Sequence, residues 1–83
     1  MNKNKEDEIL QNKIEIETMF KNEVNDFELM SKLRQKFDRI DILQSIVILS
    51  LGRNKYQLDI KTKNITKVTI FDEEQNKFVE INY

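Results

Sequence analysis

The spacing of apolar side chains changes about halfway along this chain of 83 residues. Up to about residue 40 they recur every three or four positions, and from about residue 55 they alternate with polar side chains. The first spacing is typical of amphipathic helices, and the second is typical of half-buried β-strands. No linker, repeat or low-complexity tract separates the two halves. We therefore expect a single α+β domain over residues 1–83, with the helices first.

Two helices are predicted, over about residues 6–23 and 26–40. The first has a narrow apolar arc, which Lys13 interrupts and which consists of Ile9, Ile16, Phe20 and Val24. Asn25 followed by Glu28 forms a capping box, which predicts that the second helix begins near residue 26. The apolar arc of this second helix consists of Leu29, Met30, Leu33, Phe37 and Ile40. The short connection over residues 23–26 predicts an antiparallel helical hairpin.

Residues 43–51 allow two interpretations, because the run at 46–49 is apolar on every side. Its length and its β-branched side chains favour a buried strand. The alternative is a third helix that Asp41 and Gln44 would cap and that Gly52 would end in a left-handed conformation.

Strands are predicted over about residues 55–62, 66–72 and 78–83, which gives an antiparallel meander of three or four strands. Pairing Ile60 with Val68 and Leu58 with Ile70 keeps the apolar faces together. This register leaves a three-residue loop at 63–65, with Asn64 in the left-handed conformation. The helical hairpin is expected to cover one face of the sheet, and the other face is expected to be open.

The composition excludes many kinds of active site. The chain has no histidine or cysteine and only one glycine, Gly52. It therefore lacks a cysteine nucleophile, a Ser/His/Asp relay, nitrogen or sulfur ligands for a metal, and a glycine-rich phosphate loop. The acidic run at 72–74 lacks the spacing of a calcium loop and is interpreted as a turn. We expect no catalytic residues, no cofactor and no bound metal, and a protein that is not an enzyme.

The remaining composition bears on where the protein works. No secretory signal and no apolar stretch long enough to cross a bilayer is visible, so we expect a cytoplasmic protein that does not contact the membrane. Isoleucine, lysine and asparagine are abundant, which indicates an AT-rich gene from a low-GC bacterium, phage or plasmid. Because a chain of this size has a small core, a homodimer is also expected to be accessible.

Charge is distributed unevenly. Residues 29–67 carry nine basic and three acidic side chains, between two acidic ends. This basic segment is a candidate nucleic-acid interface, formed by Lys32, Lys36, Arg39, Arg53, Lys55 and Lys63. The same charges also have structural explanations, such as helix-dipole stabilisation and protection of strand edges. Most of the chain's basic residues are lysines, which disfavours base reading by arginine.

Aromatic side chains give a second indication. In the predicted register, Phe71 and Phe78 lie on the open face of the sheet, near Tyr56 at its end. Neighbouring exposed aromatic rings commonly mark a protein contact. Together with two lysines of the same sheet, they give a candidate partner-binding set: Tyr56, Phe71, Phe78, Lys61 and Lys67. The alternative is that a helix covers this face or that a bulge turns both phenylalanines inward.

These observations lead to three functional hypotheses. The first is a small, non-enzymatic protein-interaction module, such as an inhibitor, antitoxin, immunity or anti-defence protein. The second is a nucleic-acid-binding regulator that uses the basic segment at 29–67. The third is an accessory subunit of a cytoplasmic enzyme.

Overall fold

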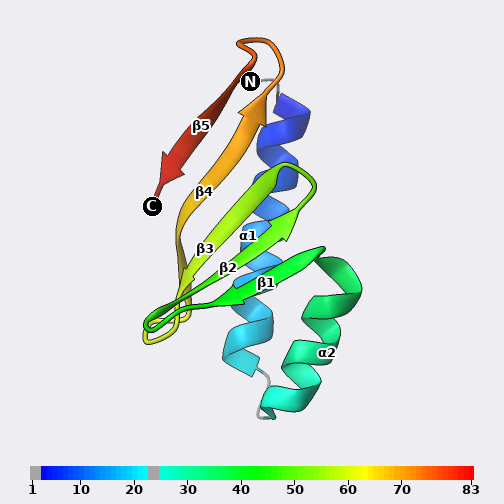
Figure 1. The fold of residues 1–83 in the computed structure, drawn as a ribbon, viewed down its shortest axis with the longest axis vertical. Coiled ribbons are helices and arrows are strands. Elements are labelled where there is room, and N and C mark those ends of the chain that lie inside the picture. Colours follow the sequence, from blue (N-terminus) through cyan, green and yellow to red (C-terminus); the bar gives the residue numbers. More distant parts are fainter. Residues whose placement is uncertain (1–2, 23–24) are drawn as a thin grey trace.

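The computed structural model describes residues 3–22 and 25–83, which form two helices followed by a five-stranded antiparallel sheet (Figure 1). The helices are α1 (Lys3–Asn22) and α2 (Asp26–Lys36). The strands are β1 (Arg39–Ile42), β2 (Ile46–Leu51), β3 (Asn54–Asp59), β4 (Asn64–Asp72) and β5 (Lys77–Asn82). Each strand pairs with the next along the chain, in the order β1-β2-β3-β4-β5. The predicted α+β architecture is confirmed, with five strands rather than three or four.

Helix α2 begins where the capping signal placed it. The side chain of Asn25 accepts hydrogen bonds from the backbone N–H groups of Phe27 and Glu28, at 2.8 and 3.4 Å. These bonds satisfy two of the amide groups that a helix leaves without a partner in its first turn. The predicted end of α1, with Glu23 and Val24, lies outside the described residues.

The predicted end of α2 at residue 40 was wrong. The helix stops at Lys36, because Phe37 already has an extended backbone, with φ −105° and ψ 144°. No glycine, asparagine or proline marks this end in the sequence. Ile40 instead lies in β1, where it pairs with Leu49 of β2. The ambiguous segment at 43–51 is therefore a turn and a strand, and the third helix does not form.

The predicted register between β3 and β4 was also wrong. Tyr56 lies opposite Val68, and Leu58 lies opposite Ile65, with a bulge between Gln57 and Leu58. The carboxylate of Asp59 accepts hydrogen bonds from the N–H groups at positions 61 and 62, which starts the turn directly after β3. Ile60 is therefore in the turn and 40% exposed. Lys63, rather than Asn64, has the positive φ, at 60°.

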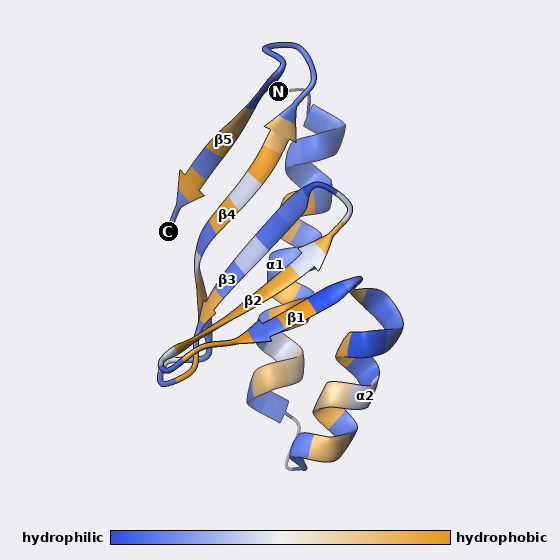
Figure 2. Ribbon diagram, viewed as in Figure 1, coloured by the Kyte–Doolittle hydropathy of each residue, from blue (hydrophilic) through white to orange (hydrophobic). Residues whose placement is uncertain are grey.

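The hydrophobic core lies between the two helices and one face of the sheet. Ile9 and Ile16 of α1, with Leu33 of α2, are almost completely buried. Helix α1 packs against β4, and α2 packs against β1. Figure 2 shows hydrophobic and hydrophilic residues alternating along β4 and β5, as expected for a sheet that is covered on one face. We call the covered face the inner face and the opposite face the outer face.

Candidate interaction surfaces

The outer face of the sheet is assigned from the register, because residues directly opposite each other on paired strands share a face. The core residues Leu49, Tyr56 and Val68 form one inner row, and their neighbours along each strand point outward. Two outer rows cross all five strands. They are Arg39, Ser50, Lys55, Thr69 and Glu80, and Asp41, Ile48, Gln57, Lys67 and Asn82.

An aromatic pair lies on the outer face, at the end of the sheet nearest the β4–β5 turn. Phe71 of β4 and Phe78 of β5 are directly opposite each other, with ring centroids 5.2 Å apart and planes at 70°. The guanidinium of Arg53 lies 4.6 Å from the centroid of Phe71. Phe78 is 60% exposed, whereas Phe71 is half-buried. The arrangement places one exposed ring beside a second ring that a cation covers.

Tyr56 does not belong to this surface, which corrects the predicted partner-binding set. Its side chain is fully buried on the inner face, where it makes an edge-on contact with Phe37. The Tyr56 hydroxyl accepts a hydrogen bond of 2.9 Å from the side-chain amide of Asn12. Burial raises the pKa of Tyr56 above 10.0, and the hydrogen bond from Asn12 acts in the opposite direction. Tyr56 is therefore a core residue.

The two lysines of the predicted partner-binding set lie in different places. Lys67 is on the outer face, and its ammonium is 3.6 Å from the carboxylate of Glu80. Lys61 is in the turn between β3 and β4, and strand β4 runs from this turn toward Phe71. At about 3.3 Å per residue, Lys61 and the aromatic pair are at opposite ends of the strand. Phe71, Phe78 and Lys67 thus share a face, and Lys61 does not adjoin them.

The residues of the predicted nucleic-acid interface fall into three groups. Arg39 and Lys55 are in one outer row, and Arg53 is in the adjacent β2–β3 turn. A second group, Lys32 and Lys36, is on α2, on the other side of the sheet, where Lys36 forms an ion pair with Glu15. Lys63 is in the β3–β4 turn. The basic segment at 29–67 is therefore continuous in sequence but does not form one surface.

Some of the charge on the outer face is balanced locally. The side chain of Arg39 is 2.9 Å from the carboxylate of Asp41, and Lys67 pairs with Glu80. Lys55 is exposed and has no ion pair with any residue in 3–22 or 25–83. The outer face thus combines polar and paired charged groups with an exposed aromatic ring.

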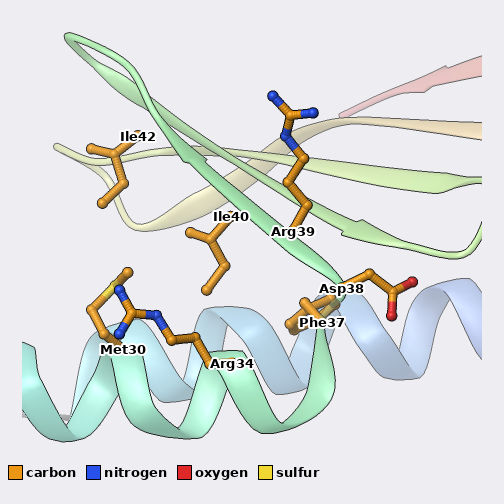
Figure 3. Close-up of a pocket in the computed structure, with 7 residues that line it drawn as sticks. All are labelled: Met30, Arg34, Phe37, Asp38, Arg39, Ile40 and Ile42. Carbon is orange, nitrogen blue, oxygen red and sulfur yellow. The ribbon is translucent and has the colours of Figure 1, made fainter.

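A groove between α2 and β1 was missed by the sequence analysis (Figure 3). It encloses about 420 Å³ and is lined by Met30, Arg34, Phe37, Asp38, Arg39, Ile40 and Ile42. A smaller groove of about 300 Å³ adjoins it and shares Met30 and Ile42. The available signal was the alternation of Ile40 and Ile42 with Arg39 and Asp41, which is typical of a strand. The helical interpretation of Ile40 concealed this signal.

Among residues 3–22 and 25–83, no group of three or more acidic side chains is placed to hold a metal ion. None of the helices in the described ranges is both long enough and apolar enough to cross a membrane.

Comparison with known proteins assigns no relative to this fold. No protein-family profile, curated protein or solved structure matches the chain.

Proposed function

We propose that this chain is a small, non-enzymatic protein-interaction module that binds another protein through the outer face of its sheet. The observation that carries the proposal is the pair formed by Phe71 and Phe78, with Phe78 exposed and Arg53 beside Phe71. Aromatic side chains and arginine are enriched where protein interfaces gain most of their binding energy. Polar residues of the outer rows, such as Thr69 and Glu80, adjoin the pair on one side, as in the rim of such an interface.

A module of this kind works by covering a surface of its partner rather than by chemistry. Inhibitors, antitoxins, immunity proteins and anti-defence proteins act in this way, and we place the chain in this broad group. An accessory subunit of a cytoplasmic enzyme would use the same face, and the identity of the bound protein would distinguish the two roles.

The second candidate function is binding of single-stranded nucleic acid on the same face. The observation in its favour is that Arg53 lies beside the aromatic pair and that Arg39 and Lys55 lie on the same face, since bases stack on aromatic side chains beside cations. Such binding weakens steeply as salt concentration rises. Acidic side chains on this face, Asp41 and Glu80, oppose it.

The test compares two exposed phenylalanines. The full chain carrying Phe78→Ser is used to capture partners from cells that carry the gene, beside the unchanged chain and the control Phe27→Ser. Phe27 is 78% exposed but lies in the first turn of α2, away from the outer face. We expect Phe78→Ser to reduce the amount of a specific captured protein about tenfold or more, as for a central interface residue. Phe27→Ser should retain it.

Nuclease treatment and salt separate the two candidates. Capture that survives nuclease and changes little between low and moderate salt supports protein binding. Capture that nuclease abolishes favours the nucleic-acid alternative. If the Phe78→Ser variant and the unchanged chain captured equal amounts, the outer face around Phe78 would be neither a protein-binding nor a nucleic-acid-binding surface.

A further inference from the structure

Strand β1 is an edge of the sheet whose backbone is available for pairing. The N–H of Leu43 donates to the carbonyl of Ile46 at 2.9 Å, which identifies these two residues as a hydrogen-bonded pair of the β1–β2 hairpin. Such pairs alternate along antiparallel strands, so Asp41 and Arg39 direct their backbone groups toward β2. The backbone N–H and C=O groups of Ile40 and Ile42 therefore point away from the sheet.

Helix α2 lies beside this edge and forms one wall of the larger groove (Figures 1 and 3). Figure 3 shows the side chains of Ile40 and Ile42 pointing from β1 toward α2, where Met30 and Arg34 lie. Ile42 is 60% exposed. An open backbone edge thus lies next to a groove that Met30, Ile40 and Ile42 line in part.

The charges of the groove favour an acidic occupant. The guanidinium of Arg34 has no hydrogen bond or ion pair with any residue in the described ranges. The carboxylate of Asp38 points away from Arg34 (Figure 3) and accepts a hydrogen bond of 2.8 Å from the N–H of Gly52. Arg39 is held by Asp41. Arg34 is therefore the cation in the groove that has no ion pair with a described residue.

We propose that the β1 edge and its groove bind an extended, acidic segment of a partner protein, which adds to the sheet as a sixth strand. Its backbone would pair with Ile40 and Ile42, its aliphatic side chains would cover Met30 and Ile42, and a carboxylate would meet Arg34. Extended peptides commonly bind sheet edges in this way, with affinity from the backbone and specificity from alternate side chains. A second copy of this chain is a poorer occupant, because the side chains of its own β1 on this face are Ile40 and Ile42, which supply no carboxylate to Arg34.

This site is separate from the outer face, so each proposal can fail without the other. The probe is a short capped peptide, Val-Thr-Glu-Thr-Val-Thr-Glu, in which valine and glutamate share one face of the extended chain, and the control peptide has lysine in place of glutamate. Both are titrated into the ¹⁵N-labelled full chain, and amide shifts and hydrogen exchange are followed by NMR. We expect the acidic peptide to shift and protect the amides of Ile40 and Ile42, and to bind about tenfold more tightly than the basic one.

Three variants test the mode of binding. Ile42→Pro removes an N–H that the sheet itself does not use, and should abolish binding of the acidic peptide. Glu80→Pro is the matched control on the opposite edge strand, β5. The N–H of Tyr83 donates to the carbonyl of Thr66, which identifies these two residues as a hydrogen-bonded pair. Because such pairs alternate along antiparallel strands, the N–H of Glu80 points away from β4. Arg34→Glu, on the exposed surface of α2, should reverse the preference between the two peptides while leaving the fold intact.

Three outcomes would overturn the proposal. One is that Ile42→Pro, folded, binds the acidic peptide as tightly as the unchanged chain does. Another is that Arg34→Glu leaves the preference between the peptides unchanged. The third is a concentration-dependent dimer, seen by sedimentation equilibrium, that Ile42→Pro disrupts, because a second copy would then be the occupant of the edge.

Discussion

At the scale of single residues, the contact between Asn12 and Tyr56 is a buried polar interaction within the core. Asn12 is 8% exposed and Tyr56 is fully buried, and their side chains share a hydrogen bond of 2.9 Å. A buried polar group without a partner is costly, so this hydrogen bond stabilises both side chains in the core. The bond ties α1 to β3 at the centre of the molecule.

Removing the Tyr56 hydroxyl should destabilise the fold. Tyr56→Phe leaves the Asn12 amide buried without this partner, and we expect the free energy of unfolding to fall by about 1–2 kcal/mol. Urea unfolding at neutral pH measures the change. Adding Asn12→Leu to Tyr56→Phe should recover part of the loss, because both polar groups are then absent. A Tyr56→Phe variant as stable as the unchanged chain would show that the bond contributes nothing.

The same residue predicts a change of stability at high pH. Burial raises the pKa of Tyr56 in the folded state above 10.0, so the folded protein keeps this proton at a pH where the unfolded chain loses it. The associated stability is complete below pH 10 and is lost as the pH rises from 10 through the folded-state pKa. Unfolding free energies measured across this range should therefore fall more steeply for the unchanged chain than for Tyr56→Phe. Parallel curves would contradict this.

At the scale of elements, the start of α2 depends on one side chain. Asn25→Ala removes the acceptor for the N–H groups of Phe27 and Glu28, and should lower the free energy of unfolding by about 1 kcal/mol. Gln35→Ala, at an exposed position within the same helix, is the control and should change stability by no more than a few tenths of a kcal/mol. Denaturant unfolding of both variants checks the difference. Equal losses in the two variants would argue against a capping role.

The elements also show which local signals are sufficient. Asn25 with Glu28 predicted the start of α2 correctly because an N-cap acts over only three residues. Ile40 misled the prediction because its position fits both the helical arc of α2 and the alternation of β1. Pairing with Leu49 of β2, a contact across the sequence, decides between them. The bulge between Gln57 and Leu58 likewise depends on the pairing of β3 with β4, and no residue pattern in the sequence predicts it.

At the scale of the whole molecule, the proposed function depends on the two helices covering only one face of the sheet (Figure 1). Alternation within a strand was enough to place Phe71 and Phe78 together on the outer face. It could not separate Lys61 from them, because alternation assigns a face but not a position along the strand. It also could not show that the basic segment divides among α2, the outer face and the β3–β4 turn.

The central claim, that the outer face around Phe78 is the protein-binding surface, is tested most directly by photo-crosslinking in cells that carry the gene. Benzoylphenylalanine replaces Phe78 in one chain and Phe27 in another, so that two exposed positions on different surfaces are compared. The account predicts a crosslink to one protein from position 78 that is absent from position 27. Crosslinking from position 78 to nucleic acid alone, or to the same proteins from both positions, would contradict it.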